Sequence, residues 1–203
     1  MHIDLIRNQV AQLAAQLIHD HGIKDFALAK RKAAKQLGIA DAHHLPSNPE
    51  ITLALQNYLE LFHADNHPAI LAEFTALAID TMQMLRAFNP YITGAVLNGT
   101  ATENSDIQIE LFTDNEKEVE LYLLNNHIQF KQDQRQIKHK GNNKHIPCFI
   151  ISTEICDIYI SVHSPSQIRN TPRDIPKAAL KRASLNYFLS LQDFNHEATS
   201  SAK

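Results

Sequence analysis

The sequence is poor in the features that mark several common classes of protein. Its 203 residues include only two cysteines, Cys148 and Cys156, which are too few for a disulfide framework, so we expect a protein of the reducing cytoplasm. It has no run of about 18 apolar residues, so we expect no membrane-spanning helix and no membrane partner. The first residues, MHIDLIRNQVAQL, carry Asp4 and Arg7 within their apolar stretch and therefore predict a helix of the mature protein rather than a signal peptide.

Motifs for several familiar chemistries are also missing. A phosphate-binding P-loop would need the pattern GxxxxGK[ST], and Gly99-Thr100 stands without it. His19, His21 and His43-His44 lack cysteine or histidine partners at zinc-finger spacing, which favours solvated histidines over a metal site. No serine stands in a nucleophile motif, and no RNA-reading motif is present.

Charge is nearly balanced, with 19 Lys and Arg residues against 22 Asp and Glu residues, but it is unevenly distributed. Basic residues gather in three segments, 20–36, 131–145 and 169–182. Basic patches on an otherwise acidic protein can steer phosphate-bearing ligands toward a site. The alternative is that these segments are solvated helix faces and loop tips.

Apolar periodicity predicts helices in the first part of the chain and strands after it. The expected helices cover residues 3–19, 26–37, 49–62 and 69–88, with a capping box at Ser47 and Glu50 before the third. The expected later elements are a short strand or turn at Val96-Leu97, a strand over 106–112, a helix over 114–126 capped by Asp114, strands over 128–138, 146–152 and 156–163, a hairpin turn at 140–144, and a closing helix over 177–192.

This order of elements predicts an α+β protein. A helical region, residues 1–88, would pack on a mixed β-sheet with flanking helices, residues 89–192, and a flexible tail would follow over residues 193–203. We favour packing over two separate domains because no Gly- or Ser-rich linker lies between Phe88 and Gly94.

The most informative segment is YITGAVLNGTATENSDIQIELF, from Tyr91 to Phe112. It has a glycine turn, a polar loop and then a strand that opens on Asp106. The segment resembles the signature of the nucleotidyltransferase superfamily, which has the DNA polymerase β-like fold. That signature is a hydrophobic residue, Gly-Ser, about ten residues, and Asp-x-Asp on a strand. Gly94-Ala95 stands at the Gly-Ser position, ten residues before Asp106.

The resemblance implies a minimal nucleotidyltransferase-like sheet over residues 89–192 and a nucleotide site that uses magnesium. In such a site, strand carboxylates hold metal ions about 3.5–4 Å apart, and the Gly-Ser turn offers N–H groups and a hydroxyl to phosphate. By this resemblance, Asp106 and Asp157 would be the catalytic and metal-binding residues. The nucleotide-binding residues would be Gly94, Ala95, Gly99, Thr100, Ser105 and Gln108.

Two positions depart from the signature. Ala95 has no hydroxyl, and Gln108 has no charge where the second aspartate belongs. Glu110 shares the strand face but lies about 13 Å from Asp106 along the strand, too far to replace that aspartate. Losing one metal-bridging carboxylate should cost on the order of a thousandfold in rate, which predicts a degenerate site. Asp106 could instead cap the Asn104-Ser105 turn in a purely structural role.

Three functions are left open by the sequence. The first is a protein that binds a nucleotide or an RNA backbone without catalysis and without Mg²⁺. The second is a Mg²⁺-dependent enzyme that transfers a nucleoside monophosphate to a protein, an RNA or a small molecule. The third is a structural module whose apolar helices form a homodimer or partner surface.

Overall fold

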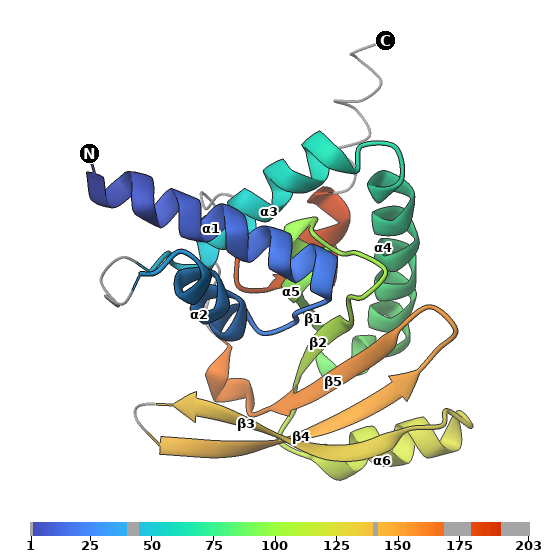
Figure 1. Ribbon diagram of the computed structural model, residues 1–203. Helices are drawn as coiled ribbons and strands as arrows, with labels where there is room; N and C mark the ends of the chain where they lie inside the picture. The colour runs from blue at the N-terminus through green and yellow to red at the C-terminus, as the bar shows by residue number, and fades with distance from the viewer. Residues whose placement is uncertain (1, 40–44, 140–141, 169–179, 192–203) are drawn as a thin grey trace.

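The structure is a computed structural model that describes residues 2–39, 45–139, 142–168 and 180–191 (Figure 1). It has the predicted α+β class, with an N-terminal group of helices packed on a six-stranded mixed sheet. Residues 140–141 of the predicted hairpin turn, residues 177–179 of the predicted closing helix and the predicted tail lie outside the described residues.

The four predicted N-terminal helices are confirmed. They are α1 (His2–His21), α2 (Phe26–Gln36), α3 (Asn48–Phe62) and α4 (His67–Met84). The predicted capping box starts α3: the Ser47 hydroxyl accepts from the Glu50 backbone N–H, and the Glu50 carboxylate accepts from the Ser47 backbone N–H. After α4, a short 3₁₀ turn, Arg86–Phe88, leads into the sheet.

The sheet has the strand order β3-β4-β5-β2-β1-β6. Its strands are β1 (Tyr91–Thr93), β2 (Ile107–Phe112), β3 (Lys131–His139), β4 (Asn142–Ser152), β5 (Asp157–His163) and β6 (Ala183–Ser184). The central pair, β2 and β5, is parallel, while the other neighbours are antiparallel. Helix α6 (Glu116–Asn125) follows β2 in the chain. The parallel pair places the starts of β2 and β5 at the same end of the sheet.

Several sequence predictions need correction. The turn predicted over residues 140–144 is shorter, because β4 already begins at Asn142, which pairs with His139 of β3. Val96-Leu97 lies in a short helix, α5 (Gly94–Asn98), because Gly94 at φ +72° turns the chain out of β1 and Gly99 at φ +73° ends the helix. The N-cap of α6 is Asn115, whose side chain accepts from the Lys117 backbone N–H, rather than Asp114. The closing helix begins only at residue 185, because the two residues before it pair with β1 as β6.

The described hydrophobic core consists of one larger cluster and two smaller ones. The larger one joins α4 to the sheet: Phe74 and Met82 of α4 are buried in one cluster with Ile107, Ile109 and Leu111, the alternate residues of β2. The smaller clusters lie among α1, α2 and α3. Figure 1 shows these three helices above the strands and α4 at their side. The intervening residues of β2, which include Gln108, therefore face away from the larger core and from α4.

Candidate functional site

A cavity of about 850 Å³ lies where the helical region meets the signature segment. Its wall is built by the α1–α2 connection, the start of α3, the Gly94–Asp106 segment, and the adjoining strands β2 and β5. The described residues that line it with polar or charged side chains are Lys24, Asp25, Asn48, Thr52, Asn98, Thr100, Thr102, Asn104, Ser105, Asp106, Gln108, Tyr159 and Lys181. Such a volume is typical of a pocket for a small ligand.

Asp106 forms an ion pair with Lys24 in this cavity. The Lys24 ammonium nitrogen lies 2.6 Å from one Asp106 carboxylate oxygen and 2.7 Å from the other. The Asp106 side chain is 11% exposed, whereas that of Lys24 is 57% exposed, so the lysine covers the carboxylate from the solvent side. The signature aspartate is thus neutralised by a cation from the helical region, 82 residues earlier in the chain.

Local contacts fix the segments that carry this pair. Helix α1 ends at His21, and Gly22 follows with a φ of +60° that turns the chain toward Lys24; a Cβ added to Gly22 would lie 3.4 Å from the Asn104 amide carbon. Within the polar loop, the Ser105 hydroxyl accepts from the Thr102 backbone N–H at 2.9 Å. From α3, the Gln56 amide donates to the Asn98 carbonyl at 2.6 Å. The loop is therefore held from both α1 and α3.

Asp157 lies beside Asp106 at the edge of this site. The register pairs Ile107 with Ile158, so the two aspartates directly precede paired residues at the starts of neighbouring parallel strands. Both carboxylates act on Tyr159, whose pKa is raised by burial first and then by the negative charges of Asp106 and Asp157. The sequence prediction that a neighbouring strand brings a second carboxylate near Asp106 agrees with this register.

Gln108 packs against the glycine turn. A Cβ atom added to Gly94 would lie 3.4 Å from the Gln108 amide carbon, and the φ of +72° at Gly94 is one that other residues rarely adopt. Ala95, the next residue, packs against the larger core and has no hydroxyl to offer to a phosphate at the turn. The glycine of the signature is thus required by the backbone, while the two altered positions are accommodated by packing.

Six of the eight predicted site residues line the cavity: Gly94, Ala95, Thr100, Ser105, Asp106 and Gln108. Gly99 and Asp157 are not among the described residues of its wall. Sequence reasoning missed Lys24 and Tyr159 as site residues, and it anticipated Lys181 only as one member of the basic segment 169–182. Both lysines were visible only as members of basic segments, since nothing local tells which lysine of a segment will face a cavity.

Magnesium, which the family resemblance implies, does not fit the residues present. Mg²⁺ prefers carboxylate and water oxygens, but the Asp106 carboxylate is already paired with Lys24 on both oxygens. Gln108 brings no negative charge to the strand position beside it. Within the described part of the chain, no group of three or more His, Cys, Asp or Glu side chains could hold a metal ion.

Glu110, the other acidic residue on this face of β2, is engaged elsewhere. One of its oxygens lies 3.1 Å from a guanidinium nitrogen of Arg182, and the other lies 3.8 Å from the ring nitrogen Nε2 of His163. Arg182 also stands 5.0 Å from the centre of the Phe112 ring. These contacts stabilise the sheet face and leave Glu110 outside the cavity wall, as its distance along the strand predicts.

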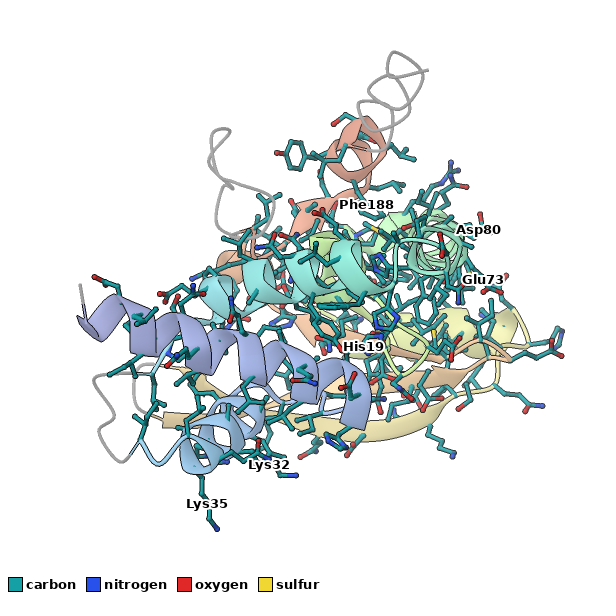
Figure 2. The ribbon with its side chains drawn as sticks, turned by 45° about the horizontal axis from the view of Figure 1, so that its top comes forward. His19, Lys32, Lys35, Glu73, Asp80 and Phe188 are labelled. Carbon is teal, nitrogen blue, oxygen red and sulfur yellow. The ribbon has the colours of Figure 1, made fainter. Side chains whose placement is uncertain are left out.

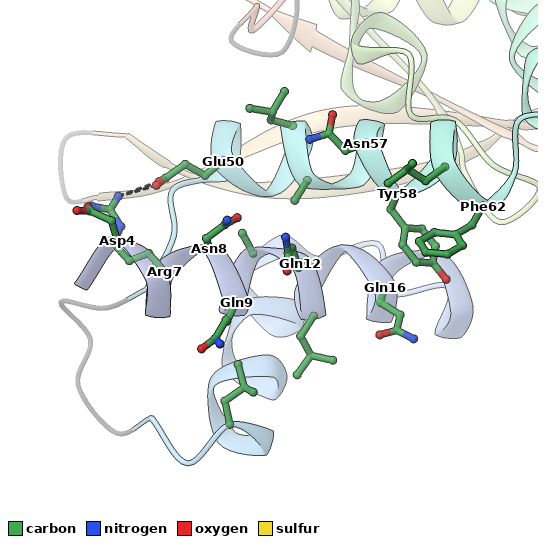
Figure 3. A pocket seen from close by; sticks show the side chains of 16 residues that line it. Asp4, Arg7, Asn8, Gln9, Gln12, Gln16, Glu50, Asn57, Tyr58 and Phe62 are labelled. Atoms are coloured by element: carbon green, nitrogen blue, oxygen red, sulfur yellow. Dashed lines mark hydrogen bonds and ion pairs between the residues drawn. The ribbon is translucent and has the colours of Figure 1, made fainter. Parts of the chain in front are cut away.

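A second cavity, of about 870 Å³, lies between α1 and α3 (Figure 3). Its charged contact is between Arg7 and Glu50, at 2.8 Å, and its other lining side chains are mainly amides and apolar groups. Glu50 also completes the capping box, and its pKa is lowered first by the hydrogen bond from the Ser47 side chain. The pair of Arg7 and Glu50 is thus explained by its role at the start of α3. We therefore take the cavity at Asp106 as the candidate site.

Comparisons of the chain with protein-family models, curated proteins and solved structures found no match. The structure defines an α+β fold with a polar cavity at the signature segment. Of the described residues, none belongs to a helix long and apolar enough to cross a membrane.

Proposed function

We propose that the chain is a nucleotidyltransferase-like protein whose degenerate site binds a nucleotide or another phosphate-bearing ligand without efficient catalysis. The observation that carries the proposal is the ion pair between Lys24 and Asp106. Nucleotidyl transfer requires metal ions that bridge the phosphates and neutralise the developing charge. A carboxylate held by a lysine on both oxygens is poorly placed to bind those ions.

The cavity supports binding rather than chemistry. Thr102, Ser105 and the amide of Asn104 are hydrogen-bonding groups along its loop wall, and Lys181 adds a positive charge outside the pair of Lys24 and Asp106. Groups of this kind recognise sugars, bases and phosphate oxygens. Removing a single preorganised charge from an active site costs on the order of a thousandfold in rate, so the neutral Gln108 alone makes efficient transfer unexpected. We also propose a reducing, cytoplasmic setting, since Cys148 and Cys156 are both thiols.

Calorimetric titration of the full chain tests the proposal. Nucleotides of the four bases would be titrated in buffer with Mg²⁺ and in buffer with EDTA, and transfer of label from α-labelled nucleoside triphosphates would be followed in parallel. We expect binding of at least one nucleotide in EDTA and no transfer of label. Binding confined to Mg²⁺ together with label transfer would instead support an enzyme, and the absence of all binding would support a structural module.

A further inference from the structure

The formal charges of the described residues that line the cavity cancel. The charged residues of its described wall are two lysines, Lys24 and Lys181, and two aspartates, Asp25 and Asp106. Their formal charges sum to zero, and Asp157 adds a negative charge just outside the wall. One aspartate has a further task, since Asp25 accepts from the Ala27 backbone N–H as the N-cap of α2. The described wall therefore holds no surplus of positive charge for a polyphosphate.

A phosphate monoester carries about −1.5 to −2 charges at neutral pH, and a triphosphate carries roughly twice that. Enzymes that bind triphosphates offset this charge with Mg²⁺ and basic side chains. Here the Lys24 ammonium group is already paired with Asp106, because its nitrogen lies 2.6 Å and 2.7 Å from the two carboxylate oxygens. The described wall offers a triphosphate no net positive charge to offset its negative charge. A ligand with little or no charge would not need such an offset.

The rest of the wall suits an uncharged polar ligand with one apolar face. Hydroxyl and amide side chains are its commonest polar groups: Thr102, Ser105, Asn48, Asn98, Asn104 and Gln108, with Thr52 and Thr100 almost fully buried. Such groups can both donate and accept hydrogen bonds, as ribose hydroxyls and base edges require. Phe26, which is half-buried, adds apolar surface on which a base could lie. The volume of about 850 Å³ is ample for one nucleoside.

We infer that the ligand of this cavity is a nucleoside or a nucleoside monophosphate, bound without metal, rather than a nucleoside triphosphate. The inference rests on the proposed function and places the ligand at the least charged end of the nucleotide series, with the nucleoside itself included. Lys24 takes the role of a resident counter-cation for Asp106, and the neutral wall selects against additional phosphates. The site of a transferase would select in the opposite sense, because its substrate is the triphosphate.

The test is a phosphate series measured by calorimetry in EDTA: nucleoside, monophosphate, diphosphate and triphosphate of each of the four bases. We expect the nucleoside or the monophosphate to bind about tenfold more tightly than the triphosphate, the scale of one uncompensated charge in a partly exposed site. Affinity that rises with each phosphate would overturn the inference and leave the proposed function standing. No binding by any member of the series would overturn both.

A charge variant gives an independent test. In Asp106→Asn, the lysine is released and the cavity gains one positive charge, so affinity for the triphosphate in EDTA should rise about five- to tenfold. A matched control is Asp114→Asn, which makes the same charge change at an exposed residue outside the cavity wall and should leave that affinity unchanged. Circular dichroism would establish that both variants are folded. A loss of triphosphate binding in folded Asp106→Asn, or an equal rise in the control, would contradict the inference.

Discussion

At the scale of single residues, the proposal of metal-free binding depends on the contact between Lys24 and Asp106. The carboxylate is mostly covered and the ammonium group is half exposed, so water still screens the pair. The larger energetic effect is the cost of leaving a covered carboxylate without its cation. Removing the lysine should therefore matter more than the net strength of the pair suggests.

We predict that Lys24→Met lowers the free energy of unfolding by about 1 kcal/mol, because Asp106 loses its counter-charge. The measurement is the thermal or urea midpoint at low ionic strength. Lys32→Met is the control, since Lys32 is exposed on α2 and Figure 2 shows it pointing away from the body of the molecule. An equal loss in both variants would show that the pair has no special role.

The glycine turn gives a second prediction at this scale. Gly94→Ala and Gly38→Ala both place a Cβ at a positive φ, +72° and +70°, and each should cost about 1 kcal/mol of stability. Only the Cβ at position 94 meets another side chain, that of Gln108, while the Cβ at position 38 meets open space. Ligand affinity should therefore fall in Gly94→Ala and stay unchanged in Gly38→Ala. Unchanged affinity in both variants would place the ligand away from the turn.

At the scale of elements, α1, α3 and α4 meet at a group of aromatic side chains. The rings of His19 and His63 have centroids 3.9 Å apart, and Figure 2 shows His19 between the helices. His67, in the first turn of α4, has a pKa lowered first by burial. Its Nε2 atom is buried and has no hydrogen-bond partner. Protonation of His67 is thus less favourable in the folded chain than in the unfolded chain.

The direction of this shift predicts a loss of stability in mild acid. Because the folded pKa lies below the unfolded value of about 6.5, His67 is neutral in both states at higher pH and costs nothing there. As pH falls below that value, the unfolded chain takes up the proton more readily, so the free energy of unfolding decreases. In His67→Gln the decrease between pH 7 and pH 5 should be smaller, measured by urea unfolding at both pH values. The exposed His21→Gln is the control; an unchanged pH dependence in His67→Gln would contradict the prediction.

The sequence predicted long elements better than short ones. Helices α1 to α4 show several turns of apolar periodicity, and α3 has a recognisable cap, so their existence followed from local pattern. Helix α5 has only five residues, which is too few to show a helical period, and Val96-Leu97 was consequently interpreted as strand or turn. The strand β6 is shorter still and exists only because β1 offers it hydrogen bonds.

At the scale of the whole molecule, the candidate site is formed by two parts of the chain that are distant in sequence. The signature segment supplied Asp106, Gln108 and the polar loop, all of which could be identified from residue spacing. Lys24 could not be identified, because its contact with Asp106 spans 82 residues and depends on how the chain turns at Gly22 after α1. The packing of helices on the sheet, predicted from the missing linker, is what closes the cavity.

The same packing makes the cavity differ from the metal site that the resemblance to nucleotidyltransferases implies. Gly94 turns the chain at φ +72°, and the parallel strands β2 and β5 bring Asp106 and Asp157 side by side. The helical region then supplies a lysine at the point where the nucleotidyltransferase signature implies a metal ion. We therefore regard the ion pair as the feature that separates this site from a metal-dependent one.

The most direct test of this account is the ratio of nucleotide affinities measured in Mg²⁺ and in EDTA for the unmodified full-length chain. We predict a ratio close to one for the tightest-binding nucleotide, because Lys24 already neutralises the carboxylate that a metal ion would need. A nucleotide that binds about a hundredfold more tightly in Mg²⁺ than in EDTA, the scale of several kcal/mol expected for a bound metal, would contradict the account.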